Sequence, residues 1–201
     1  MVGARASVRL LRLADEPRER GEVVAVPCDV NEWDQQQELV RRALETFGRI
    51  DVVVANAGCE LGSPLIGGSH TPDAWRQMIL TNVYGLALTI RATAPSLVEA
   101  AGDLVLMGSV AGRVAIPGDL YSATKWAVTG IAESIRRSLV GTGVRVILIE
   151  PGRVDTQLRR DDIAAPRLDP DDVADAVLFA GGQPRTVAIN EIVMRPVHQE
   201  V

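Results

Sequence analysis

The chain has 201 residues, 47% hydrophobic and 23% charged, which is typical of one globular domain covering residues 1–201. Its formal net charge of -5 argues against a nucleic-acid partner, and no apolar run approaches the roughly 18 residues of a membrane span, so we expect neither nucleic-acid nor membrane binding. The N-terminus lacks the apolar stretch of a secretory signal, so a cytoplasmic protein is expected. The two cysteines, Cys28 and Cys59, make neither a disulfide framework nor a metal site, so no bound metal is expected.

Short apolar runs alternate with longer segments of helical periodicity. Strands are predicted at residues 22–27, 51–55, 104–107, 144–149 and 187–194, and helices at 36–47, 72–97, 121–139 and 171–180. Thr71 and Pro72 are a start signal for the second helix, and Asp169 or Pro170 for the last. Apolar strands that are each followed by a helix predict an α/β fold, a Rossmann-like doubly wound parallel sheet with helices on both faces.

Ligands of such sheets bind beyond the carboxyl ends of the strands, where the strand order reverses. The residues directly after each apolar run are therefore the candidates for a binding site. They are Asp29, Asn56 to Gly58, Gly108, Ser109 and the segment from Pro151 to Thr156.

Tyr121 and Lys125 form a Y-x-x-x-K pair whose side chains project from one helix face. Alone, the pair is better interpreted as two surface residues. The context changes that interpretation, because Ser109 follows an apolar strand twelve residues before Tyr121. In addition, Asn82 lies inside an otherwise apolar helix, where asparagine has poor propensity.

Together these motifs resemble the compact branch of the short-chain dehydrogenase/reductase family, from about residue 22 to the C-terminus. The resemblance implies that Asn82, Ser109, Tyr121 and Lys125 are catalytic. A tyrosine hydroxyl has a pKa near 10, and a neighbouring ammonium lowers that pKa, so Tyr121 can act as the general acid or base. By the same resemblance, Ser109 binds the substrate oxygen, and Asn82 kinks its helix and holds a water that connects Lys125 to solvent.

The resemblance also implies NADP as the cofactor, with NAD as the other possibility. Arg9 and Arg12, near the place where the family reads a 2'-phosphate, are a hint of NADP. The cofactor contacts that it implies are Asp29 and Val30 at the adenine, Asn56, Ala57 and Gly58 at the adenosine half, Tyr121 and Lys125 at the nicotinamide ribose, and Pro151, Gly152, Val154 and Thr156 beside the nicotinamide.

The family's glycine-rich phosphate loop is not found at the start of the chain. Gly3 is the only glycine before Gly21, so the sheet is expected to lack the usual first strand and this loop, with residues 1–21 a divergent or truncated segment. Two buried strand edges would then face a gap. Residues 6–13 are interpreted as a remnant of the second strand, or as a segment that fills this gap. Losing two or three amide bonds to phosphate at about 1.5–3 kcal/mol each would weaken cofactor binding.

Two functions remain open at this point. The first is an NAD(P)-dependent oxidoreductase that interconverts a small alcohol and its carbonyl, and the C-terminal strand resembles reductases of 3-hydroxy acids and serine-like substrates. The alternative is a truncated, non-catalytic binding or oligomerisation module without cofactor affinity. Under either, the family commonly pairs through the helices at 72–97 and 121–139, so a homodimer or homotetramer is expected, with Trp126 in the interface or the core.

Overall fold

The computed structural model describes residues 1–5, 10, 21–62, 64–67, 71–156, 158 and 166–200. The strands are β1 (Val2–Ala4), β2 (Ala25–Pro27), β3 (Val52–Ala55), β4 (Asp103–Met107), β5 (Arg145–Pro151) and β6 (Glu191–Met194). The helices are α2 (Trp33–Phe47), α3 (Pro72–Ile79), η1 (Leu80–Gly85), α4 (Leu86–Ala100), η2 (Val110–Gly112), α5 (Leu120–Ser138) and α6 (Pro170–Gly181).

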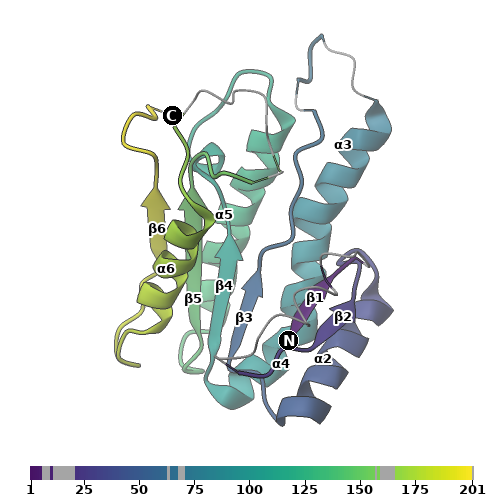
Figure 1. Ribbon diagram of the computed structural model, residues 1–201, viewed down its shortest axis with the longest axis vertical. Coiled ribbons are helices and arrows are strands. Elements are labelled where there is room, and N and C mark those ends of the chain that lie inside the picture. The colour runs from purple at the N-terminus through teal and green to yellow at the C-terminus, as the bar shows by residue number, and fades with distance from the viewer. Residues whose placement is uncertain are drawn as a thin grey trace.

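The main sheet has four parallel strands in the order β3-β4-β5-β6 (Figure 1). Successive residues of a strand point to opposite faces of the sheet. Leu104 and Leu106 of β4 therefore pack in the apolar core with residues of α4 and α5, whereas Val105 packs in a second core with Ala180 of α6. The helices cover both faces, which confirms the predicted doubly wound α/β fold.

A second sheet joins β1 and β2 in parallel, with Val2 opposite Ala25. The strand β1 was not predicted, because three residues give no periodicity. Within the described ranges, β1 pairs only with β2, and β3 only with β4, so both have an edge without a strand partner. On β3, Val52 and Val54 are 52% and 46% exposed, unlike the buried residues of β4. Residues 6–13, apart from Leu10, lie outside the described residues, and Arg9 and Arg12 are among them.

Several element boundaries differ from those predicted. The expected helix at 72–97 is divided into α3, the π-helical turn η1 and α4, and the apolar runs at 22–27 and 187–194 are strands only in their last three or four residues. The start signals are confirmed: Thr71 Oγ1 accepts a hydrogen bond from the Ala74 amide, and Asp169 caps α6 with Pro170 as its first residue. In the described ranges, none of the helices combines the length and apolar character that a membrane span needs.

Candidate active site

The π-helical turn η1 directs Asn82 into the protein, where it is 2% exposed. Its side-chain oxygen accepts a hydrogen bond from the Cys59 amide at 2.8 Å. Its side-chain nitrogen donates to the Cys59 carbonyl at 2.9 Å and to Thr124 Oγ1 at 3.0 Å. Single π-turns inside α-helices are frequent at functional sites. Asn82 thus joins the loop after β3 to the helix α5.

Lys125 lies one helical turn after Tyr121 on α5, and both side chains are buried, at 6% and 8% exposed. The Lys125 Nζ donates a hydrogen bond to the Met107 carbonyl at 2.9 Å and lies 5.6 Å from the centroid of the Tyr121 ring. The capped start of α5 places them: Asp119 accepts a hydrogen bond from the Ser122 amide. The pair is therefore not the exposed surface pair that its spacing alone would favour.

Burial lowers the pKa of Lys125 from 10.5 to about 8, because the ammonium loses hydration, and the nearby Cys59 opposes this change. Lys125 is also the only lysine among the 21 basic residues of the chain. The other basic residues are all arginines, while the single lysine is buried at the carboxyl edge of the sheet. With a pKa of about 8 the group is still mostly an ammonium at neutral pH, so Lys125 can place a positive charge beside Tyr121.

Ser109 follows β4 and caps the short helix η2. Its Oγ accepts a hydrogen bond from the Ala111 amide at 3.2 Å and lies 3.5 Å from the Pro151 carbonyl of β5. Ala111 and Tyr121 belong to one apolar cluster, so the Tyr121 ring packs against the turn that Ser109 begins. The structure thus brings the four residues predicted as catalytic to one edge of the sheet.

The loop after β3 runs along the same edge and is exposed at Asn56, Ala57 and Gly58. A Cβ at Gly58 would lie 3.4 Å from Asn82 Oδ1 and 3.8 Å from Lys125 Nζ. Gly58 therefore borders both polar groups, and a Cβ there would be in ordinary van der Waals contact with them.

The candidate adenine contacts lie at the end of the second sheet. Asp29 Oδ1 accepts a hydrogen bond from the Asn31 amide at 3.0 Å, which forms a local turn. Val30 packs on Gly85, where an added Cβ would lie 2.7 Å from the valine Cγ2. The turn η1 therefore meets Val30 at one end and Cys59, through Asn82, near its middle.

The segment after β5 contacts the C-terminal part of the chain. The Gly152 amide donates to the Met194 carbonyl at 2.7 Å, and Val154 forms a parallel bridge with Leu168. Thr156 Oγ1 accepts a hydrogen bond from the Leu158 amide at 3.3 Å. Pro151, through its carbonyl, lies next to the Oγ of Ser109, one of the four predicted catalytic residues.

Sequence reasoning missed the residues that hold this arrangement. Cys59 was not among the predicted site residues, yet its backbone binds both polar ends of the Asn82 side chain. Thr124 lies inside the Y-x-x-x-K segment and accepts from Asn82. Its polar side chain, three residues after Tyr121 and so on the same helix face, was the available signal.

A doubly wound α/β domain with a buried Tyr-Lys pair and a serine at its carboxyl edge is the architecture of a nucleotide-dependent oxidoreductase domain. Residues 1–166 match the family model described as short chain dehydrogenase. The chain belongs to the short-chain dehydrogenase family, a family of oxidoreductases.

Individual relatives agree with this assignment. The chain is 38% identical over 179 residues to an uncharacterized oxidoreductase of Staphylococcus aureus (strain MRSA252), covering 87% of this chain and 77% of that protein. An alcohol dehydrogenase from the archaeon Thermococcus sibiricus, complexed with 5-hydroxy-NADP, is 30% identical with a TM-score of 0.89, covering 99% of this chain and 86% of that one. The closed form of a serine dehydrogenase complexed with NADP+ is 32% identical with a TM-score of 0.88, covering 99% and 85%.

Proposed function

We propose that this protein is an NADP-dependent dehydrogenase that interconverts a small alcohol and its carbonyl, with NAD as the other possible cofactor. The observation that carries the proposal is the buried Lys125 ammonium beside Tyr121, on an edge that Ser109 and Asn82 also reach. Two structural relatives, the Thermococcus alcohol dehydrogenase and the serine dehydrogenase, are complexed with 5-hydroxy-NADP and NADP+.

The residues present fit the nicotinamide-ribose half of such a cofactor. Lys125 carries the donors that ribose hydroxyls accept from, and the exposed Gly58 borders its Nζ. Tyr121 is expected beside the same ribose, and Pro151, Gly152, Val154 and Thr156 beside the nicotinamide. We assign Asp29, Val30, Asn56 and Ala57 to the adenosine half.

A bound nicotinamide would supply or accept the hydride. In the reductive direction, Tyr121 gives its hydroxyl proton to the carbonyl oxygen as the hydride reaches the carbonyl carbon, and Lys125 stabilises the phenolate that remains. Ser109 orients the substrate oxygen. Asn82 is proposed to hold a water through which the proton returns.

The serine dehydrogenase likeness favours small polar alcohols, such as serine and 3-hydroxy acids, as substrates. The two free thiols fit the cytoplasmic location that we propose.

The first experiment titrates the purified chain with NADPH and with NADH and follows nicotinamide fluorescence. Saturable binding at micromolar concentration, followed by turnover in a screen of small alcohols and carbonyls, is expected. Tyr121→Phe should then lower kcat by about 10²–10⁴-fold while leaving cofactor binding within a few-fold, because it removes the transferred proton and at most one hydrogen bond to the ribose. No binding up to millimolar cofactor would instead favour the non-catalytic binding or oligomerisation module.

We further propose that two copies pair through α4 and α5. An apolar groove of about 1210 Å³ lies between these helices, and small residues, Ala87, Ala94, Ala127 and Gly130, line it. A second copy would place the same two helices against this groove and bury it on both sides. Ala127→Arg should therefore give a monomer by light scattering, while Asp175→Arg on α6, which packs on the other face of the sheet, should leave the assembly intact. A monomeric parent protein would contradict the proposal.

A further inference from the structure

A buried carboxylate beside the candidate active site has no role in the reaction proposed above. Glu150 lies near the end of β5, directly before Pro151, and its side chain is 0% exposed. A buried charge is costly unless it is paired and hydrogen-bonded. The contacts that compensate Glu150 therefore indicate what the carboxylate holds in place.

Two elements reach the Glu150 carboxylate from different directions. Arg113 Nε donates to Oε2 at 2.5 Å, and Thr129 Oγ1 lies 3.0 Å from Oε1. Arg113 also pairs with Glu191 of β6, whose side chain is 45% exposed. Both oxygens of Glu150 thus have partners, one after η2 and one on α5.

Arg113 and Ser109 are the two ends of one short turn, since Ser109 caps the start of η2 and Arg113 its end. Two successive residues of β5, Glu150 and Pro151, contact these two ends. The Pro151 carbonyl lies 3.5 Å from Ser109 Oγ, and the Glu150 carboxylate binds Arg113. The ion pair therefore fixes the end of the turn that is remote from Ser109.

The same carboxylate connects the turn to α5. Thr129 Oγ1 lies 3.2 Å from the Lys125 carbonyl and 3.4 Å from the Gly112 carbonyl, in addition to Glu150. A hydroxyl donates one hydrogen bond at a time, and a charged carboxylate is the strongest acceptor of the three. A Cβ at Gly112 would lie only 2.7 Å from the Lys125 carbonyl, so the turn packs directly on the helix that carries Lys125.

We propose that Glu150, through Arg113 and Thr129, is a positioning residue that sets Ser109 relative to Tyr121 and Lys125. The inference rests on the proposed function for its effect on turnover. Its structural part, the ordering of the turn 109–113 by a buried carboxylate, stands without it.

The kinetic test uses Glu150→Gln, which keeps the side-chain shape and removes the charge. We expect kcat to fall about 10- to 100-fold, because a small displacement of Ser109 would misplace the substrate oxygen. The KM for NADPH should stay within a few-fold of the parent value. In a Ser109→Ala background the same change should have almost no further effect, because the residue that Glu150 positions is already gone. Thr129→Val should lower kcat and Thr129→Ser should restore it. Asp103→Asn, which removes another buried, arginine-paired carboxylate of the sheet, is the matched control and should leave kcat unchanged.

A second readout needs no activity. Amide hydrogen exchange should become faster in Glu150→Gln at Ala111 and Gly112, whose amides donate to Ser109, while α5 amides exchange as before. Uniformly faster exchange, or an effect on kcat that persists undiminished in the Ser109→Ala background, would overturn the positioning role. If the parent protein turns over no substrate, the proposed function fails, and the exchange at Ala111 and Gly112 still decides the structural part. If Glu150→Gln does not fold, the Thr129 pair provides both readouts.

Discussion

At the scale of single residues, the state of Lys125 matters most, because the proposed chemistry needs its ammonium. Its pKa of about 8 means that the free protein loses this charge in mildly alkaline solution. Since the chain has no other lysine, the side-chain ¹³Cε signal of labelled lysine reports on Lys125 alone. We expect a titration midpoint near pH 8 in the folded protein and near 10.4 in urea. A folded-state midpoint above 10 would contradict the desolvated environment.

The same shift has a consequence for stability. Between pH 8 and about 10.4 the unfolded chain binds more protons at this lysine than the folded chain, so stability from this group increases with pH in that window. Below pH 8 the cost of burying the ammonium is constant. Lys125→Met should remove this slope in urea unfolding measured from pH 7.5 to 10. An unchanged slope would mean that another group is responsible.

Sequence motifs predicted the candidate reacting residues but not the residues that support them. Tyr121, Lys125 and Ser109 belong to local patterns, and the structure places them at one edge of the sheet, as expected for their positions after apolar strands. Glu150 and Arg113 are 37 residues apart and meet only through the packing of η2 on β5. No local spacing signals such a pair, since its partners are set by the three-dimensional fold.

At the scale of elements, the turn η1 is where sequence periodicity was wrong. Apolar spacing predicts one continuous helix, because a single π-turn changes the register by one residue and barely disturbs the apolar pattern. The cause of the turn lies outside the helix, in the three hydrogen bonds that Asn82 makes to Cys59 and Thr124. Asparagine at a buried helical position was the only local sign.

Asn82→Ala should therefore destabilise the protein by about 2–3 kcal/mol, because it leaves the partly buried amide and carbonyl of Cys59 without their partners. Urea unfolding measures this loss. Tyr84→Phe in the same turn is the matched control. Its side chain is 48% exposed and the substitution removes only the hydroxyl, so its cost should stay within about 0.5 kcal/mol. Equal losses in the two variants would show that the stability does not depend on the hydrogen bonds of Asn82.

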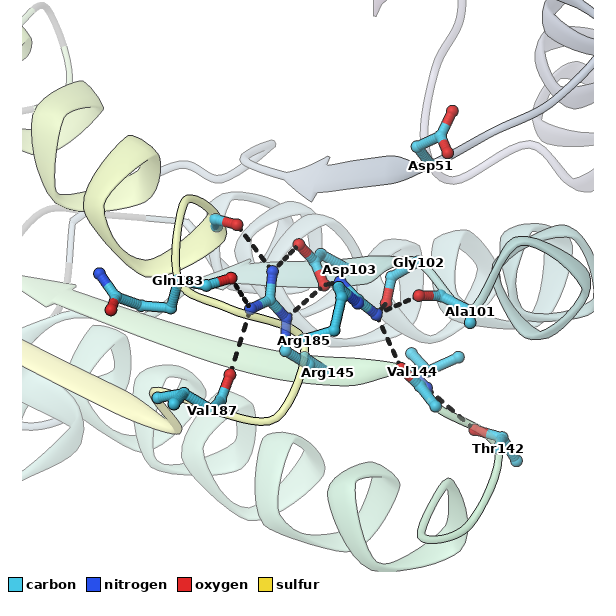
Figure 2. A network of polar contacts seen from close by, with 12 residues as sticks. Asp51, Ala101, Gly102, Asp103, Thr142, Val144, Arg145, Gln183, Arg185 and Val187 are labelled. Carbon is cyan, nitrogen blue, oxygen red and sulfur yellow. Dashed lines mark hydrogen bonds and ion pairs between the residues drawn. The ribbon is translucent and has the colours of Figure 1, made fainter.

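At the scale of the whole molecule, the two ends of the sheet carry different groups of polar residues. The carboxyl ends of the strands carry the candidate site, while the amino ends of β4 and β5 carry a buried ion pair (Figure 2). Arg145 binds both oxygens of Asp103, at 2.8 and 2.6 Å, and Arg185 adds a third bond at 2.7 Å. Figure 2 shows the two guanidinium groups beside the carboxylate, with backbone carbonyls around them.

This network connects the loop after α6 to the amino ends of β4 and β5. Arg145 also donates to the carbonyls of Gly181, Gln183 and Val187, and Arg185 donates to the carbonyl of Gly143. The loop between α6 and β6 is thereby tied to the start of β5. Because these contacts lie at the end opposite the candidate site, their loss should affect stability and not turnover.

Asp103→Asn is the corresponding test, and its effect should depend on pH. Burial alone would raise the pKa of Asp103, but the hydrogen bonds and charges of Arg145 and Arg185 outweigh it and hold the pKa below its usual value. The carboxylate therefore contributes stability above the unfolded pKa of about 3.9, and this contribution is lost as the pH falls through the lower folded pKa. Removing one partner of a buried pair costs about 3–5 kcal/mol.

Urea unfolding of the parent protein and of Asp103→Asn should thus differ by about that amount at pH 7, where both arginines remain beside a neutral side chain in the variant. The difference should stay constant down to about pH 5 and shrink below about pH 4, as the parent carboxylate takes up its proton. A difference that persists unchanged to pH 3 would mean that the substitution costs packing rather than charge. In that case the backbone hydrogen bonds of Arg145, and not the ion pair, would hold this end of the sheet together.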